Sequence, residues 1–241
     1  MIAVLPQQGG GTLVQDDLLA PPVTLVPPRA RLRAPATGTH LFRLAAKEIL
    51  DRFAAFALLL GLLPLLLVVG IGVRLGSPGP AIFRQERIGR HGREFHIWKF
   101  RSMRDGADIE LQALLAENGR DGEPLFKVPN DPRITRLGAF LRRTSLDELP
   151  QLVNVLLGHM SLVGPRPQRA VEVALYAPED WARLSMKPGI TGLWQVSGRS
   201  TLSWAQAIDC DLRYVREWSL LFDLRILART VVVVLRREGA V

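Results

Sequence analysis

Two adjacent carboxylates are the clearest chemical feature of this sequence. Asp147 and Glu148 lie side by side in RRTSLDELPQLVNVL, residues 142–156. Such a pair is ordinary at the start of a helix, because the first turn has free N–H groups and the positive end of the helix dipole. Carboxylates also hold the metal ions that neutralise phosphates. The residues around the pair must therefore decide between capping and catalysis.

Two basic loops downstream of the carboxylates favour catalysis. In GPRPQ, a proline on each side holds Arg166 in a stiff stretch that suits a guanidinium–phosphate contact. In KPGITGLWQVSGRS, glycines accompany Lys187 and Arg199, so backbone N–H groups can approach an anion closely. Two such loops after an acidic pair predict a site for a polyphosphate and a metal ion.

Two helix registers compete at the carboxylates. With Ser145 as the N-cap, residues 145–148 form a capping box. With Asp147 as the N-cap, Pro150 falls in the first turn, where its missing N–H costs little, and this register is favoured. The helix then ends at Gly158. Its core-facing stripe would be Leu149, Leu152, Val153, Leu156 and Leu157.

Composition limits the partners and the setting. The chain has 241 residues and a net charge of +8, which favours an anionic partner: a phosphorylated ligand, acidic lipid or nucleic acid. Nucleic acid is disfavoured, because the basic residues accompany Pro/Gly loops rather than a reading helix. The single cysteine, Cys210, excludes an internal disulfide and fits a reducing compartment.

An apolar segment precedes these motifs. Residues 1–40 form a Pro/Gly-rich stretch that we interpret as a disordered tail, and the 21 residues from Phe53 to Val73 carry no charge. A straight helix of this length would be roughly 30 Å long and could span a bilayer. However, Pro64 lies near its middle and basic residues flank both ends, so a kinked re-entrant helix with both ends in the cytoplasm competes with a spanning helix. Lys47, Arg52 and Arg74 could extend to lipid phosphates.

The remaining chain predicts a mixed domain. AIFRQERIG and REFHIWKFRSM indicate two strands around the turn RHG, and DIELQALLAENG indicates an amphipathic helix. ITRLGAFLRRTS indicates a short helix before the carboxylates. The segment from AQAIDCDLRYV to the end is helical in pattern, and it would pack on the core or lie on the membrane surface.

Three ordered blocks of this sequence resemble the bacterial sugar transferase family, the monotopic polyprenyl-phosphate phosphoglycosyl transferases. They are FRQERIGRHGREFHIWKFRSM, DPRITRLGAFLRRTSLDELPQLVNVLLGHMSLVGPRP and MKPGITGLWQVSGRS. The resemblance covers about residues 41–238 and is to the small form of the family, without the extra membrane helices of the long form.

The resemblance implies a reaction. The family transfers a sugar phosphate from a UDP-sugar to polyprenyl phosphate, with undecaprenyl phosphate expected here, and releases UMP. The position of Asp147 is the family's nucleophile, which forms a covalent aspartyl–phosphosugar, and that of Glu148 is its Mg²⁺ ligand. A carboxylate at a helix N-terminus would stay ionised, as a nucleophile must.

The resemblance also carries over other positions. Lys99 and Asp211 match family residues at the active site, where Arg166 and Arg199 would hold substrate phosphates. From the residues alone, Lys99 could be a solvated strand residue, and Asp211 could pair with a neighbouring arginine. Pro64 matches the family's helix break, which favours re-entry.

The resemblance implies an α/β fold, mostly helical with a small β-hairpin. It divides the chain into a tail (1–40), a re-entrant membrane helix (41–76) and a catalytic domain (77–241) on the cytoplasmic face of the bacterial inner membrane. UDP-sugar, polyprenyl phosphate and membrane lipid are the expected partners, and a homodimer is left open. A membrane-anchored binding protein and a metal-dependent lipid phosphatase or pyrophosphatase are the alternatives.

Overall fold

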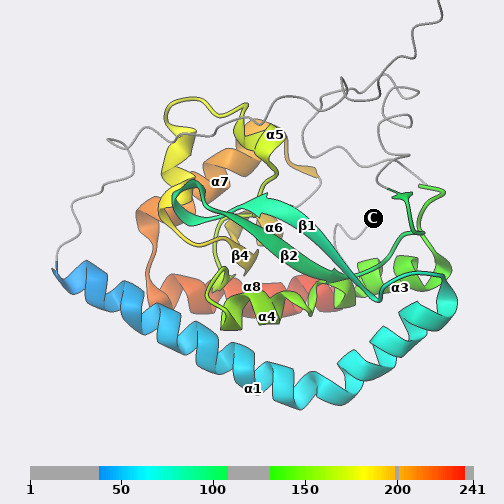
Figure 1. Cartoon of the computed structure of the whole chain (residues 1–241). Coiled ribbons are helices and arrows are strands. Elements are labelled where there is room, and N and C mark those ends of the chain that lie inside the picture. Colours follow the sequence, from blue (N-terminus) through cyan, green and yellow to red (C-terminus); the bar gives the residue numbers. More distant parts are fainter. Residues whose placement is uncertain (1–37, 108–130, 199–200, 237–241) are drawn as a thin grey trace, which may run out of the picture.

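A long helix begins the described part of the chain. The computed structural model describes residues 38–107, 131–198 and 201–236. Its first element is α1 (Gly38–Gly76), a 39-residue helix with Pro64 inside it. Figure 1 shows α1 bent into two arms that both rise from the bend toward the rest of the chain. A proline inside a helix causes such bends, because it removes a backbone hydrogen bond and crowds the preceding turn.

A β-hairpin follows α1, as the sequence predicts. Strand β1 (Ile82–Ile88) pairs antiparallel with β2 (Glu94–Phe100), and the short turn η1 (Arg90–Gly92) joins them. Ile88 N–H continues the pairing by donating to the Gln168 carbonyl oxygen at 2.8 Å. The predicted helix DIELQALLAENG, residues 108–119, lies outside the described residues.

The carboxylates lie between two short helices rather than at the start of one. Helix α3 (Arg136–Thr144) begins at Thr135, whose side chain caps it, and ends at Ser145 in a left-handed conformation. A single 3-10 turn, η2 (Leu146–Glu148), follows, and α4 (Gln151–Leu156) begins after Pro150. Both predicted capping registers are therefore wrong, because the left-handed Ser145 ends α3 and restarts the chain as a separate turn.

Helix α4 faces the core with a different set of residues from the predicted stripe. Leu152 and Val155 are buried, whereas Leu156 and Leu157 are exposed. Asn154 is fully buried and joins α4 to β2, because its amide donates to the His96 carbonyl at 2.7 Å and accepts from Trp98 N–H at 3.0 Å. The stripe was misplaced because α4 has only six residues and its polar Asn154 points inward. The predicted stop at Gly158 is confirmed by its left-handed φ of 83°.

The C-terminal half builds a second small sheet and two longer helices. Strands β3 (Ser161–Val163) and β4 (Gly189–Thr191) pair in parallel, with α5 (Ala170–Val173) and η3 (Asp180–Ser185) between them. They are followed by α6 (Leu193–Ser197), α7 (Trp204–Glu217) and α8 (Leu220–Arg236). The described residues thus form a mostly helical fold with two small sheets, as expected.

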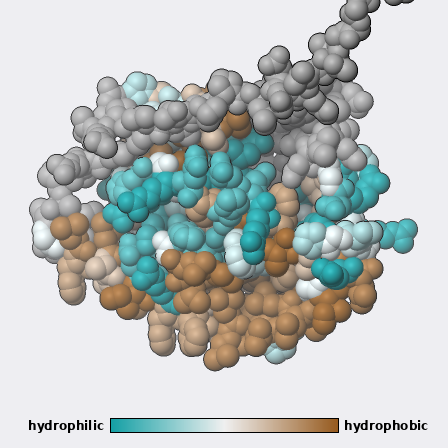
Figure 2. All heavy atoms as spheres, viewed as in Figure 1, coloured by the Kyte–Doolittle hydropathy of each residue, from teal (hydrophilic) through white to brown (hydrophobic). Residues whose placement is uncertain are grey.

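The outer surface of α1 is apolar. The helical stretch Leu41–Gly76 is long and apolar enough to cross a membrane. Of its most apolar 18-residue segment, 11% is buried. Figure 2 shows the resulting hydrophobic band along the side of the molecule that α1 occupies. Helix α8 adds an exposed apolar stripe, which consists of Leu221, Leu224, Val231, Val232 and Leu235.

Polar residues of α1 fix its N-terminal arm to the rest of the chain. Lys47 is buried and its Nζ lies 2.7 Å from Asp223 Oδ2 of α8. The prediction that Lys47 reaches lipid phosphates is therefore wrong, because this buried carboxylate holds its ammonium group. Glu48 contacts Lys187 at 2.9 Å, and Asp51 accepts a hydrogen bond from Ser161 of β3 at 2.5 Å. The N-terminal arm is thus part of the folded body.

Candidate active site

The two carboxylates differ in burial although they are neighbours. Asp147 is 8% exposed within η2, whereas the Glu148 side chain is 33% exposed. Lys99 lies on β2, and its Nζ lies 2.7 Å from Glu148 Oε1. The structure therefore brings together Asp147, Glu148 and Lys99, three of the residues that the sequence singled out.

Burial sets the protonation of Asp147. Desolvation, followed by repulsion from Glu148, raises the pKa of Asp147 from 3.8 to about 6, while Lys99 and Arg142 oppose the rise. The expected reason for its ionisation, a helix N-terminus, is wrong, because Asp147 lies in a three-residue turn and desolvation outweighs the favourable charges in setting its pKa. A pKa near 6 still leaves most of the carboxylate ionised at pH 7.

Arg142 of α3 is a second cation near Asp147, and it was not assigned to the site from the sequence. Its Nε donates to Ser102 Oγ at 3.0 Å, which fixes the side chain, and its charge lowers the pKa of Asp147. The available signal was its place in the RRTSLDE run, just before the carboxylates. Asp147 thus has two cationic neighbours, Lys99 and Arg142, on separate elements.

Arg166 lies in the loop that follows β3. Its guanidinium group stacks over the Trp194 ring, with 4.9 Å from Cζ to the ring centroid. Its Nε is buried and has no hydrogen-bond partner among the described residues. A desolvated donor of this kind is costly unless something else binds it, so Arg166 is suited to receive an anion.

Arg87 is a basic residue that sequence reasoning missed. It lies on β1 and its side chain is 12% exposed, with Nη1 3.4 Å from the Pro167 carbonyl oxygen. Burial, followed by repulsion from Arg166, lowers the pKa of Arg87 to about 10, and Glu172 and Glu148 oppose the shift. The signal was an arginine on the inward face of a strand in FRQERIG, where an apolar residue is usual.

Asp211 is placed away from solvent. It lies on α7 with 1% exposure, and its Oδ2 accepts from Arg183 Nε at 3.1 Å and from Arg166 N–H at 3.2 Å. Burial raises the pKa of Asp211, and the Arg183 guanidinium opposes that shift. Of the two readings that the sequence left open for Asp211, the structure shows the ion pair with an arginine. Arg183 itself had no local sequence signal.

The last predicted phosphate ligand cannot be placed. Arg199 lies outside the described residues. Lys187, from the same basic loop, is paired with Glu48 of α1 at 2.9 Å. The loop is thereby tied to the N-terminal arm of α1 through its first residue.

The donors around the carboxylates fit a magnesium ion that is bound together with substrate. The described residues contain no group of three or more His, Cys, Asp and Glu side chains that would form a complete protein site. Magnesium commonly uses one or two carboxylates and takes its other ligands from water and substrate phosphates. The partly exposed carboxylate of Glu148, beside that of Asp147, is such a donor set.

Comparisons with known proteins agree on one family. The family profile described as "Bacterial sugar transferase" matches residues 42–237. The undecaprenyl-phosphate galactose phosphotransferase of Salmonella typhimurium is 50% identical over 165 residues, which are 67% of this chain and 35% of that protein. The UDP-glucose:undecaprenyl-phosphate glucose-1-phosphate transferase of Xanthomonas campestris is 42% identical over 221 residues, 88% of this chain and 43% of that protein.

A shorter relative is covered almost completely. The exopolysaccharide production protein ExoY of Rhizobium meliloti is 40% identical over 198 residues, 81% of this chain and 88% of that protein. By contrast, the chain spans less than half the length of the Salmonella and Xanthomonas relatives. The shared part includes both carboxylates, the hairpin and the two basic loops, since the family match runs through all of them.

Proposed function

The chain belongs to the bacterial sugar transferase family, and on that basis we propose that it transfers a sugar phosphate from a UDP-sugar to polyprenyl phosphate and releases UMP. The observation that carries the proposal is the buried Asp147 beside the more exposed Glu148, with Lys99 and Arg142 next to them. One carboxylate is desolvated, as suits a nucleophile, and the other remains accessible to a metal ion. The named substrates of the relatives, UDP-glucose and undecaprenyl phosphate, agree with this chemistry.

The reaction divides into two displacements at one phosphorus atom. In the first, a carboxylate oxygen of Asp147 attacks the β-phosphorus of the UDP-sugar. A new P–O bond forms to Asp147, the bond to the bridging oxygen breaks, and UMP leaves with that electron pair. In the second, a phosphate oxygen of polyprenyl phosphate attacks the same phosphorus, and the Asp147 carboxylate is released. The soluble and the lipid substrate then never need to be bound together.

The neighbouring residues have separate tasks in this scheme. Glu148 would hold the magnesium ion, which when bound neutralises charge on the diphosphate. Lys99 and Arg142 keep the Asp147 carboxyl ionised near neutral pH, because both lower its pKa. Arg166, with its desolvated Nε, would bind a phosphate oxygen of the UDP-sugar.

The apolar surface supplies the lipid substrate in this proposal. The two arms of α1 would dip into one leaflet and return at Pro64, and the exposed stripe of α8 would lie along the interface. Arg225 and Arg229 are exposed on α8 beside that stripe, where they can meet acidic lipid headgroups. The active site would then face the cytoplasmic side of the bacterial inner membrane.

A nucleotide-product assay tests the proposal. Membranes that contain the chain, incubated with a panel of UDP-sugars, polyprenyl phosphate and Mg²⁺, should release UMP. A phosphosugar adduct on Asp147 should be detectable by mass spectrometry when the lipid is omitted, and it should be missing in Asp147→Asn. Release of UDP, or no nucleotide product across the panel, would overturn the proposal.

The same assay separates the alternatives. A lipid phosphatase or pyrophosphatase would release free phosphate or sugar phosphate and leave the polyprenyl chain without a sugar. A membrane-anchored binding protein would retain its ligand and would be unaffected by Asp147→Asn. Glu148→Gln is expected to lower UMP release and to weaken its dependence on Mg²⁺, because the carboxylate proposed to hold the ion is lost.

A further inference from the structure

Hydrogen bonds fix the backbone of Arg166, in addition to its flanking prolines. Asp211 Oδ2 accepts from Arg166 N–H at 3.2 Å, and Arg183 Nη2 donates to the Arg166 carbonyl oxygen at 3.2 Å. Arg183 and Asp211 also bind each other, with Arg183 Nε 3.1 Å from the same Oδ2. One ion pair therefore satisfies both backbone polar groups of a single residue.

Burial makes this arrangement costly unless it has a further role. The side chains of Arg183 and Asp211 are both 2% exposed. Two buried charges lose their hydration, and apolar residues of similar volume often stabilise a protein as well as a buried ion pair does. What apolar residues cannot provide is a fixed hydrogen-bonding geometry on both sides of the Arg166 Cα atom.

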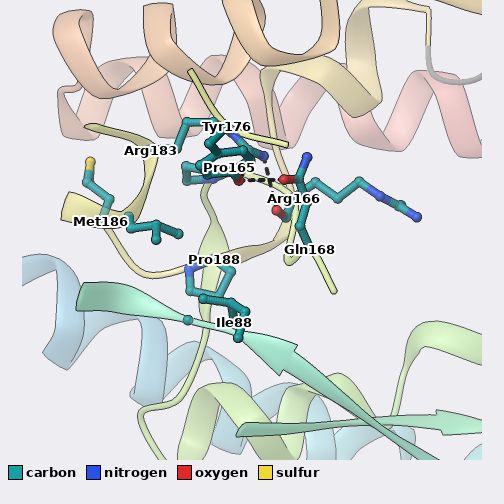
Figure 3. A pocket seen from close by; sticks show the side chains of 10 residues that line it. Ile88, Pro165, Arg166, Gln168, Tyr176, Arg183, Met186 and Pro188 are labelled. Carbon is teal, nitrogen blue, oxygen red and sulfur yellow. Dashed lines mark hydrogen bonds between the residues drawn. The ribbon is translucent and has the colours of Figure 1, made fainter. Parts of the chain in front are cut away.

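Neighbouring side chains extend the hydrogen-bond network of the ion pair. Arg183 Nη1 donates to the Tyr176 hydroxyl, which in turn contacts Gln168 Oε1. Gln168 is anchored to the hairpin, because its carbonyl accepts from Ile88 N–H at 2.8 Å. Figure 3 shows Arg183 and Tyr176 together at one wall of a small pocket, whereas the Arg166 side chain extends away from it. The Arg166 guanidinium thus lies over the Trp194 ring while the Arg166 backbone is fixed by the ion pair.

We infer that the Arg183–Asp211 ion pair is a positioning device, which fixes the Arg166 backbone so that its guanidinium is aimed at the diphosphate of the substrate. This inference rests on the proposed function. The side chains of Asp211 and Arg183 are almost fully buried and bind each other, so in this inference Asp211 acts through Arg166 rather than as a phosphate ligand. Preorganisation of this kind matters because a displacement of about 1 Å can lower a rate about 100-fold.

A mutant cycle with Arg166 tests the inference. In the clamp variant, Arg183→Met and Asp211→Leu replace the pair by apolar residues of similar size, so that no buried charge is left alone. We expect kcat/KM for the UDP-sugar to fall about 10- to 100-fold in the clamp variant. In an Arg166→Ala background, the same two changes should cost less than about twofold, because the group that they position is already absent.

A matched buried ion pair is the control. Asp131 and Arg133 are both 4% exposed and lie on a different segment. Replacing them with Leu and Met should give the same fold-change whether or not Arg166 is present, because the pair lies on a different segment from Arg166. Thermal midpoints are measured for all variants. The inference is overturned if the clamp variant is also additive with Arg166→Ala, or if the control pair shows the same coupling.

A binding measurement keeps the inference separate from the proposed function. The Kd for UDP is measured by calorimetry through the same cycle. Coupling in the Kd without any transfer by the unaltered chain would support the positioning role of the ion pair and refute the proposed transferase function. Transfer by the unaltered chain, without coupling between the ion pair and Arg166, would refute only the positioning role. If the clamp variant does not fold, Arg183→Lys keeps a buried cation for Asp211 but shortens the reach to the Arg166 carbonyl, and the same cycle applies.

Discussion

Lys99 Nζ lies 2.7 Å from Glu148 Oε1, which joins strand β2 to the turn that carries both carboxylates. Asp147 is the buried member of the pair, and Lys99 supplies a positive charge beside it. That charge lowers the pKa of Asp147 and so opposes the rise caused by burial and by Glu148. Strand β2 therefore contributes to the ionisation of Asp147 through Lys99.

The first prediction concerns the pH dependence of transfer. In the proposed mechanism the attacking group is the ionised Asp147, and its pKa is raised to about 6 by burial and by Glu148. The single-turnover rate of adduct formation should be level above pH 7 and should fall about tenfold per pH unit well below pH 6. Rapid-quench measurements between pH 5 and 8 check this. An acid limb centred near pH 4 would show that burial does not control the group.

Removing Lys99 should move that acid limb. Lys99→Met eliminates a charge that lowers the pKa of Asp147, so the limb should shift to higher pH. A shift of about one unit would lower the rate at pH 6.5 roughly threefold through ionisation alone. Lys99→Arg keeps the charge and is the matched control. Equal pH profiles for the two variants would argue against this electrostatic role.

The raised pKa also predicts a stability effect of the opposite sign. Asp147 binds its proton more tightly in the folded chain than in the unfolded one, so its contribution to stability falls as pH rises from about 4 to about 6. The full penalty, on the order of 2 to 3 kcal/mol, is present at pH 7. Asp147→Asn lacks it and should unfold at a higher temperature than the unaltered chain at pH 7.5. The difference should vanish below pH 4.

Thermal unfolding in detergent at the two pH values measures this. The comparison within one variant across pH matters more than the absolute midpoint, because Asn also changes local hydrogen bonds. A stabilisation of Asp147→Asn that was the same at pH 4 and pH 7.5 would mean that ionisation is not its source.

Breaking the buried Lys47–Asp223 ion pair should cost more stability than breaking an exposed pair. Lys47→Met leaves Asp223 buried without its cation, although Tyr214 and Trp218 still hydrogen-bond to it. Breaking one side of a buried pair costs about 3 to 5 kcal/mol. The exposed pair Arg213–Glu217 is the control, since Arg213→Met should cost less than about 1 kcal/mol.

Unfolding in denaturant compares the two variants. Lys47→Met should lower the midpoint clearly, and Asp223→Asn in the same chain should recover part of the loss, because the unpaired charge is then removed. Equal, small effects of Lys47→Met and Arg213→Met would show that the N-terminal arm of α1 is not fixed by this contact.

Local patterns predicted the elements that the structure confirms. The hairpin followed from two strand-like runs around a Gly-containing turn, and α3 from the short helical run ITRLGAFLRRTS. These signals lie within a few residues of the elements they specify, so they can be read directly. The carboxylate turn could not be read in this way, because the left-handed Ser145 that separates it from α3 is neither Gly nor Asn.

The arginine network depended on contacts between distant segments. Asp211 and Arg183 are 28 residues apart, and Arg166 lies 45 residues from Asp211. Nothing near Arg183 in the sequence marks it as a partner, and it could equally have been a solvated surface residue. The sequence did supply Arg166 through its flanking prolines, but the part of the protein that orients Arg166 became visible only in the fold.

The bend at Pro64 gives the last prediction. If α1 re-enters the leaflet, cysteines introduced at Gly38 and Gly76 should both react with a membrane-impermeant reagent from the cytoplasmic side. Both positions have open space around them, so the substitutions should not disturb packing. The native Cys210 is first replaced by serine. Labelling from opposite sides of the membrane would refute re-entry.

Replacing Pro64 with leucine makes the same test more specific. Pro64→Leu returns the missing backbone donor and removes the ring clash, so a straighter α1 is expected. Its apolar window is long enough to cross a bilayer, so part of the population should then expose position 38 on the far side. Leu63→Pro, with Pro64→Leu in the same chain, moves the bend by one residue and should keep both labels cytoplasmic. If Pro64→Leu leaves both labels cytoplasmic too, the folded contacts of the N-terminal arm, rather than the proline, set the topology.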